Sequence, residues 1–174
     1  MILEPLPVHD GALPGPVLTE VTRLYASNHA FFALSGDFPD PAEITEEQVA
    51  KALADELAHP SAEVLLARYE GKLLGLVALL GQHPDPSDPD PWIGLLLVDG
   101  RVHRQGIGRE LVRLIEERLR DAGHAAVRLA ILENNDQAGW FWTNLGYELI
   151  GYAEDLELKR PCVLMRKELA PTAG

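Results

Sequence analysis

The stretch His103-Arg104-Gln105-Gly106-Ile107-Gly108 lies between a short apolar run and a longer amphipathic segment. The run before it, Trp92 to Val98, has the length and composition of a buried strand. The segment after it has apolar residues at helical spacing, with Gly123 as a natural stop: Ile107, Leu111, Leu114, Ile115 and Leu119. The pattern therefore predicts a strand, a glycine-containing turn and a helix in direct succession.

A turn of this kind directs several backbone N–H groups and the positive end of a helix at one point, which favours a phosphate group. Gly106 and Gly108 have no Cβ, so a pyrophosphate can approach the main chain closely. We therefore expect a phosphorylated cofactor at this turn.

The composition is that of an ordinary globular protein, with 174 residues, 47% hydrophobic and 24% charged. We expect residues 1–174 to form a single domain. No long apolar run predicts a membrane span, and no basic and apolar leader follows Met1. The one cysteine, Cys162, is expected to be a buried strand residue and fits a reducing, cytoplasmic location.

The formal net charge of −12 argues against binding to nucleic acid, which needs concentrated Lys and Arg. It favours a cationic small molecule or peptide as partner, although an acidic surface also serves solubility alone. His9, His59 and His124 are isolated near segment ends, so we expect no metal site.

The flanking sequence predicts further helices and strands around the central segment. Thr45 and Gln48 form a capping box at the start of one helix, and Glu70-Gly71 predicts a hairpin turn. The expected helices cover 17–32, 45–57, 106–123 and 135–145, and the expected strands cover 2–6, 63–69, 73–80, 92–98, 126–132, 147–152 and 162–167. The proline-rich segment 82–91 is expected to be a long hairpin loop. Helices on a mixed sheet follow from this order.

The segment from Trp92 to Tyr152 resembles the GNAT superfamily of acyl-CoA-dependent N-acetyltransferases. One signature of that family is Gln or Arg, two residues, Gly, one residue, and Gly or Ala, which His103 to Gly108 follows apart from its first position. A second pattern is matched, with its spacing, by Asn135, Ala138, Phe141-Trp142 and Gly146-Tyr147. Both patterns occur in order, which makes the resemblance specific.

The resemblance implies an α/β (α+β) fold: a mixed, mostly antiparallel central sheet with helices on both faces and a splayed strand pair at the cofactor cleft. It implies acetyl-CoA as cosubstrate, without a metal. Backbone groups of Leu96, Leu97 and Val98 would bind the pantetheine and the thioester oxygen, and Asn135, Phe141 and Trp142 would lie along the pantetheine arm. The pyrophosphate would be held at the turn by backbone groups of the loop His103, Arg104, Gln105, Gly106, Ile107, Gly108 and Arg109.

Three positions depart from the family's pattern. His103 stands where Gln or Arg is usual. Trp142 replaces a tyrosine proposed to protonate the leaving thiolate, and an indole cannot act as that acid. Ala130 stands where some members that modify protein N-termini have a glutamate. We therefore assign no catalytic side chain.

Several substitutes for the missing acid and base stay open. Tyr147, Tyr152 or a water could protonate the thiolate, or no acid is needed. Glu133 and Asp136 are candidates for the base, but are expected to cap the following helix. The loop acids and histidine are expected either to border the acceptor cleft or to be solvated: His83, Asp85, Asp88 and Asp90.

The resemblance places the acceptor near the first two helices. That region holds an aromatic and acidic set that belongs either to the core or to a pocket wall suited to an amine: His29, Phe31, Phe32, Asp37, Phe38, Asp40 and Glu43.

We expect an N-acetyltransferase that transfers acetyl from acetyl-CoA to a primary amine of a small molecule or peptide, by direct attack in a ternary complex. A non-catalytic acyl-CoA-binding or sensing domain is the alternative. A dinucleotide-binding oxidoreductase is disfavoured, because the first glycine of its fingerprint and the repeated βαβ halves are missing. The strand of Trp92 and the C-terminal strands could pair across the subunits of a homodimer.

Overall fold

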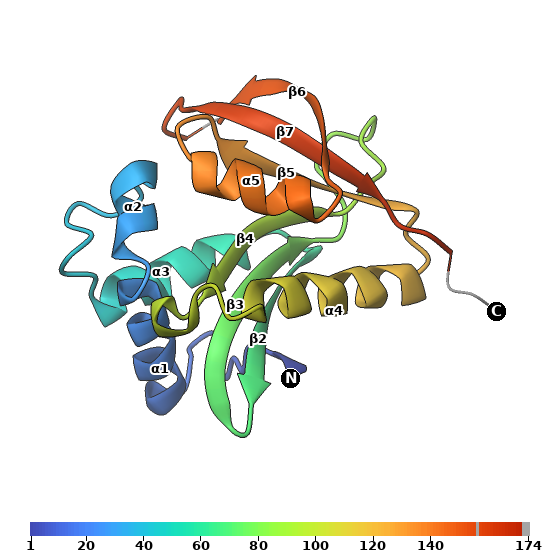
Figure 1. Cartoon of the computed structure of the whole chain (residues 1–174). Coiled ribbons are helices and arrows are strands. Elements are labelled where there is room, and N and C mark those ends of the chain that lie inside the picture. The colour runs from blue at the N-terminus through green and yellow to red at the C-terminus, as the bar shows by residue number, and fades with distance from the viewer. Residues whose placement is uncertain (156, 172–174) are drawn as a thin grey trace.

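Seven strands form one sheet in the order β1-β2-β3-β4-β5-β7-β6 in the computed structural model, which describes residues 1–155 and 157–171. The strands are β1 (Ile2–Pro5), β2 (Ala62–Tyr69), β3 (Lys72–Leu80), β4 (Trp92–Val98), β5 (Ala126–Leu132), β6 (Glu148–Glu154) and β7 (Pro161–Glu168). The helices are α1 (Gly15–Ala26), α2 (His29–Ser35), α3 (Glu46–Glu56), α4 (Ile107–Asp121) and α5 (Asp136–Asn144), with a 3₁₀ turn at Gly100–Val102. Figure 1 shows α4 and α5 in front of the sheet, and α1 to α3 on its other side.

Two apolar layers fill the spaces on either side of the sheet. Along β2, Leu65 and Ala67 point to the layer under α4 and α5, whereas Val64 and Leu66 point to the layer under α1 to α3. This alternation has the period of two that a strand buried on both faces requires. Helices on both faces of a mixed sheet were predicted, and this fold class is confirmed.

The feature that positions the candidate site is the separation of β4 from β5. They are the one parallel pair of neighbouring strands in the described sheet, and their register covers Trp92 with Arg128 and Ile93 with Leu129. Beyond these residues β4 runs on to Val98 without a strand partner on that side. A register shift opposite Ala78/Leu79 adds a bulge in β4 near the same point. The predicted splayed strand pair is therefore present.

The long helix expected over 17–32 is instead two helices, α1 and α2, with a break at Ser27 and Asn28. The buried amide of Asn28 donates to the carbonyls of Leu24 (2.9 Å) and Val98 (3.0 Å). Because the second bond ties the break to the end of β4, tertiary contacts override the apolar spacing on which the prediction rested.

Local signals elsewhere predicted the structure correctly. The capping box of Thr45 and Gln48 begins α3, and Glu70 and Gly71, both with positive φ (49° and 77°), connect β2 to β3. The proline-rich segment 82–91 joins the antiparallel strands β3 and β4, as expected of a hairpin loop.

The edges of the sheet are β1 and β6. β4, the strand of Trp92, lies inside the sheet between β3 and β5. The pairing of subunits through this strand and the C-terminal strands stays a prediction. The mostly antiparallel order also excludes the doubly wound sheet that a dinucleotide-binding oxidoreductase requires.

Candidate active site

The glycine turn leads into α4 with its backbone donors free. Gly106 is the residue before the helix and has φ 82°, and Arg104 also lies in the left-handed region at φ 62°. The first bond of the helix runs from the N–H of Glu110 to the carbonyl of Gly106. The N–H groups of Ile107, Gly108 and Arg109 precede that bond and can donate to an external anion. Only glycine adopts the conformation of Gly106 without strain.

Gly108 has a different reason to lack a side chain. A Cβ built on it would lie 3.2 Å from two ring carbons of Phe141 in α5. The expectation that both glycines serve a close approach of pyrophosphate is thus incomplete, since Gly108 also allows α5 to pack on the first turn of α4.

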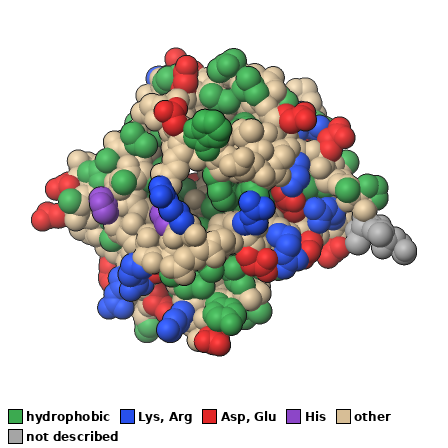
Figure 2. Space-filling model, viewed as in Figure 1, with side chains coloured by type: hydrophobic (Ala, Val, Ile, Leu, Met, Phe, Trp, Pro, Cys, Tyr) green, Lys and Arg blue, Asp and Glu red, His purple; other side chains and the backbone are tan. Residues whose placement is uncertain are grey.

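Two arginines beside the turn have no ion-pair partner among the residues that the structure describes. Arg104 and Arg109 are exposed and unpaired, whereas Arg101 pairs with Asp99 at 2.5 Å. Arg113, one turn further along α4, pairs with glutamates of its own helix. Figure 2 shows a hollow in the middle of this face, between α4 and α5, with Lys and Arg side chains around it. The turn therefore offers an anion both backbone dipoles and free positive charge.

His103 does not point its ring nitrogen at an open anion site. Its Nε2 lies 2.8 Å from the carbonyl oxygen of Val98, which also accepts the bond from Asn28. Because a carbonyl only accepts, Nε2 must carry the proton. His103 thus ties the turn to the end of β4.

Asn135 is the residue that caps α5, through a bond from the N–H of Ala138 to Oδ1 (3.1 Å). The expectation that Glu133 and Asp136 cap this helix is therefore wrong, because Asn135 is the N-cap residue. Asp136 is the first residue of the helix, and Glu133 lies before it. The amide of an asparagine suits this position because its oxygen reaches the third N–H of the helix.

The aromatic pair of α5 is divided between the surface and the core. Phe141 is half-buried and packs on Gly108. Trp142 is only 6% exposed and stacks edge-on with Phe141 and Tyr147. Trp142 therefore belongs to the core, and its place along the pantetheine arm stays a prediction.

Neither of the two tyrosines considered as a proton donor to the leaving thiolate has a position that suits this role. Tyr147 is 2% exposed and donates to Glu116 (3.2 Å), which also binds Lys167. Burial and the charge of Glu116 raise the pKa of Tyr147. Tyr152 lies exposed on the edge strand β6.

The acids of the proline-rich loop were expected to be solvated or to border the acceptor. Asp88 and Asp90 are instead buried: Asp88 accepts from the indole of Trp92 (2.7 Å), and Asp90 accepts from Arg128 and Arg166 (2.8 Å each). Asp88 holds the loop on β4 and β5, and Asp90 holds it on β5 and β7, and this local role corrects the expectation.

The acceptor region near α1 and α2 contains a tight aromatic group. Phe32 and Phe38 are buried around Tyr25, with ring centroids 5.3 and 6.0 Å from its ring. These residues belong to the core. Phe31 is half-buried, and Asp37 pairs with Arg160 at 2.9 Å.

Glu56, at the last position of α3, was not predicted from the sequence as a site residue. Its Oε2 would lie 3.8 Å from a Cβ built on Gly94 in the bulge of β4. The sequence held one signal for this residue. A negative charge in the last turn of a helix interacts unfavourably with the helix dipole, so a glutamate there suggests a role other than stabilising the helix.

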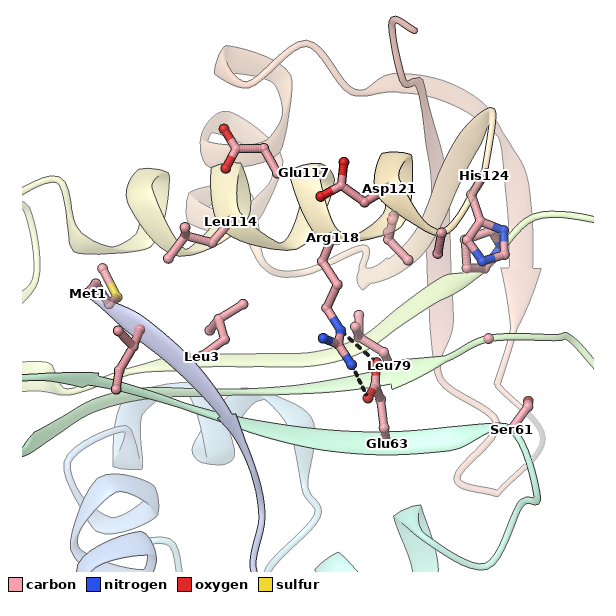
Figure 3. Close-up of a pocket in the computed structure, with 15 residues that line it drawn as sticks. Met1, Leu3, Ser61, Glu63, Leu79, Leu114, Glu117, Arg118, Asp121 and His124 are labelled. Atoms are coloured by element: carbon pink, nitrogen blue, oxygen red, sulfur yellow. Dashed lines mark hydrogen bonds and ion pairs between the residues drawn. The ribbon is translucent and has the colours of Figure 1, made fainter. Parts of the chain in front are cut away.

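A second hollow of about 710 Å³ lies at the other end of α4 (Figure 3). It separates α4 from β1 and β2, and Arg118 crosses it to pair with Glu63 at 2.9 Å. Because its two central charges neutralise one another and it lies far along α4 from the glycine turn, it is not part of the candidate site.

The described residues form no group of three or more His, Cys, Asp and Glu that could hold a metal ion. Within the same part of the chain, each helix is too short or too polar to cross a membrane. Cys162 is buried in β7, as predicted, and burial raises the pKa of its thiol.

Comparison with solved structures shows the same fold. An acetyltransferase from Thermus thermophilus superposes with a TM-score of 0.72 at 20% identity, over 97% of this chain and 98% of that one. An aminoglycoside 6'-N-acetyltransferase complexed with coenzyme A gives 0.63 at 15% identity, over the whole of both chains. A GNAT family acetyltransferase from Elizabethkingia anophelis with acetyl-CoA bound gives 0.58 at 16% identity, over 68% of this chain and 82% of that one.

Among curated proteins no sequence matches this chain. The profile of the acetyltransferase (GNAT) family matches residues 24–147, which include both motifs and the splayed strands. The chain therefore belongs to the GNAT acetyltransferase family.

Proposed function

We propose that this protein is an N-acetyltransferase that transfers the acetyl group of acetyl-CoA to a primary amine of a small molecule or peptide. The observation that carries this proposal is the opening between β4 and β5 beside the free N–H groups at the start of α4. A CoA pyrophosphate at the turn and a pantetheine arm entering the opening would bring the thioester to β4. Leu96 and Leu97 supply backbone groups there, and the carbonyl of Val98 is already engaged by Asn28 and His103.

The geometry favours direct attack in a ternary complex. Attack of an amine on a thioester builds negative charge on the carbonyl oxygen, and a fixed backbone donor on β4 would stabilise that charge without reorganisation. The cofactor turn and α1 to α3 lie on opposite faces of the sheet. Two reactants that enter from these faces meet at the opening, and holding them together supplies much of the rate.

The first test is release of free CoA thiol from acetyl-CoA by the purified protein in the presence of a panel of amines. We expect release that depends on both the protein and one class of amine. Binding of acetyl-CoA without release above background, for every amine tried, would contradict transfer.

That negative result would favour the alternative, an acyl-CoA-binding or sensing domain. The observation in its favour is that Trp142 is buried and Tyr147 is held by Glu116, so neither supplies an acid. A CoA thiol, with an ordinary pKa near ~8.5, leaves readily without one, and we therefore favour the enzyme. Calorimetry of CoA binding beside the thiol assay separates the two.

Three further expectations stay predictions. They are a single domain over residues 1–174, a cytoplasmic location and a homodimer. The continuous sheet from β1 to β7 supports the first of them.

A further inference from the structure

The short helix α2 is fixed at both of its ends to strands of the sheet. Asn28, the residue before the helix, donates to the carbonyl of Val98, the last residue of β4 (3.0 Å). At the other end, the guanidinium of Arg160 donates to the carbonyl of Ser35 (2.6 Å) and to the carboxylate of Asp37 (2.9 Å). Since Arg160 directly precedes β7, the helix connects two parts of the sheet that lie on opposite sides of the opening.

Arg160 is also held firmly on its own side of the opening. Its Nε donates to Oδ2 of Asp155 (2.7 Å), and its backbone N–H donates to the same oxygen (2.9 Å). The next residue, Pro161, accepts at its carbonyl from the N–H of Glu133 (3.0 Å), which follows the end of β5. Arg160 thus ties the end of α2 to the ends of β5 and β7. Bonds from a guanidinium to carboxylates are charge-assisted, so this connection is a strong one.

These contacts close a ring around the opening between β4 and β5. From Ile93, where the pairing of the two strands ends, the ring follows β4 to Val98 and crosses along α2. It then returns through Arg160 to the end of β5. Figure 1 shows α2 at the side of the molecule where β4 and β5 end. Without Arg160 the opening would be a slot that is open at its wide end. With it, an acceptor that comes from the side of α1 to α3 has to pass through a closed aperture.

The aperture is narrow, and solvent reaches into it. Gly94 of β4 and Ala130 of β5 are the first residues after the last pair of the two strands, and both are exposed. Paired strands lie about 4.8 Å apart at that end, and α2, with seven residues, spans about 10 Å at the other. A helix with its side chains is about 10–12 Å wide. A helix or loop of a folded protein is therefore too wide to enter, whereas an unbranched chain that ends in an amine can pass.

We propose that Arg160 determines the class of acceptor, because it closes a ring that admits a slender primary amine and excludes an amine on the surface of a folded protein. This inference rests on the proposed function and names its substrate class: a small molecule whose amine stands at the end of an unbranched chain. Arg160 acts here on specificity and not on the chemical step, since its guanidinium binds α2 and Asp155 at the rim of the aperture.

The activity test compares slender acceptors (butylamine, putrescine and lysine amide) with a wide one, the amino groups of folded lysozyme. Thiol release from acetyl-CoA is measured for the wild type and for Arg160→Ala. The matched control is Arg118→Ala, which removes an arginine that pairs with Glu63 (2.9 Å) at the other end of α4. We expect the wild type to prefer the slender amines. Arg160→Ala should raise kcat/KM for lysozyme relative to theirs about tenfold or more, mainly through KM, and Arg118→Ala should leave that ratio unchanged.

Asp37→Asn is a milder variant of the same connection, because Arg160 keeps its bond to the carbonyl of Ser35. It should shift the ratio in the same direction by a smaller factor, and it serves where Arg160→Ala does not fold. Equal use of slender and wide acceptors by the wild type, or a ratio that neither variant changes, would overturn the proposal.

A labelling experiment measures the aperture without turnover. Ala130 faces away from α5, since the next residue, Leu129, faces the layer under that helix. Ala130→Cys is made together with Cys162→Ser and treated with N-ethylmaleimide or with a maleimide attached to lysozyme. Ala125→Cys is the control, because Ala125 is exposed just before the other end of β5. We expect the wide reagent to be slower than the small one by a factor about tenfold larger at position 130 than at position 125, and Arg160→Ala to remove that difference.

The two experiments together separate this inference from the proposed function. Labelling that depends on size and on Arg160, without thiol release for any acceptor, would keep the ring as a size filter and refute the transfer. Thiol release that does not distinguish slender from wide acceptors would keep the transferase and refute the role of Arg160. Equal discrimination between the two reagents at positions 130 and 125 would show that the opening is not closed at its wide end.

Discussion

Asn28 connects the first helices to the central strand β4 at the candidate site. Its amide donates to Leu24 at the end of α1 and to Val98 at the end of β4. His103 reaches the same carbonyl from the glycine turn. One carbonyl oxygen thus joins the break between α1 and α2, the end of β4 and the glycine turn. Since both donors are needed to hold three segments, their removal should not be additive.

We predict that Asn28→Ala lowers the free energy of unfolding by about 1–3 kcal/mol, because it leaves buried carbonyls short of a donor. His103→Ala, at an exposed position, should cost less, about 0.5–1 kcal/mol. The double variant should lose more than the sum, because Val98 then has neither side-chain partner. Urea denaturation of the four proteins in this cycle measures the difference, and strict additivity would show that the shared carbonyl does not couple the two segments.

At the scale of elements, Asp90 fixes the loop between β3 and β4 to the far strands. It is 7% exposed and accepts from Arg128 of β5 and Arg166 of β7. Arg128 stands opposite Trp92, where β4 and β5 still pair. This cluster therefore lies where β4 and β5 still pair, at Trp92 and Arg128. Beyond Ile93 the two strands separate and form the opening of the candidate site.

The pKa of Asp90 gives this cluster a pH dependence. Burial alone would raise that pKa, but the hydrogen bonds from Arg166 and Arg128 together outweigh it and lower the pKa below its ordinary 3.8. A carboxyl whose pKa is lower in the folded state stabilises the protein fully above its unfolded pKa. That stabilisation is lost as the pH falls below 3.8 and through the lowered value.

We predict that Asp90→Asn costs about 2 kcal/mol of unfolding free energy at pH 7, the scale of hydrogen bonds to charged groups. The difference from the wild type should shrink steadily as the pH falls below 3.8. Asp10→Asn, at an exposed position outside any ion pair of the described chain, serves as control and should stay within about 0.5 kcal/mol. A difference that does not change with pH would show that packing of the loop, and not the charge, is what Asp90 supplies.

The elements that the sequence predicted well are those whose signals are local. The capping box at Thr45, the Glu70-Gly71 turn and the Gly106 start of α4 each depend on a few neighbouring residues. The break at Asn28 and the burial of Asp90 were not predicted, because their partners lie 70 and 38–76 residues away. The glycine turn followed from motifs, whereas the nearness of Glu56 to Gly94 depends on how α3 packs on α1 and β2.

At the scale of the whole molecule, the charge of −12 and the proposed ligand stand in apparent conflict. An anionic cofactor should be repelled by a strongly acidic protein. Exposed charges further apart than about 8–10 Å are largely screened at physiological salt, however, so the charges near the turn decide. There the free cations are Arg104 and Arg109. The unpaired charge beside the glycine turn is therefore positive, which suits the anionic cofactor that we propose there.

This positive charge predicts that replacement of Arg104 and Arg109 by Ala weakens acetyl-CoA binding about tenfold or more, which is ~1.4 kcal/mol or above. A ligand at 100 times its Kd stabilises a protein by about 2.7 kcal/mol, so the stabilisation by the same concentration of acetyl-CoA should fall to about half. Denaturation with and without acetyl-CoA measures both values.

Arg113→Ala is the matched control for this prediction, because Arg113 lies on the same helix and already pairs with Glu110 and Glu117. Its loss should leave acetyl-CoA binding nearly unchanged. Added salt should weaken binding by the wild type and by Arg113→Ala, and have less effect on the double variant, since screening acts on the charges that the double variant lacks. Equal salt dependence in all three proteins would mean that backbone N–H groups alone hold the pyrophosphate, and that the arginines at the turn serve another purpose.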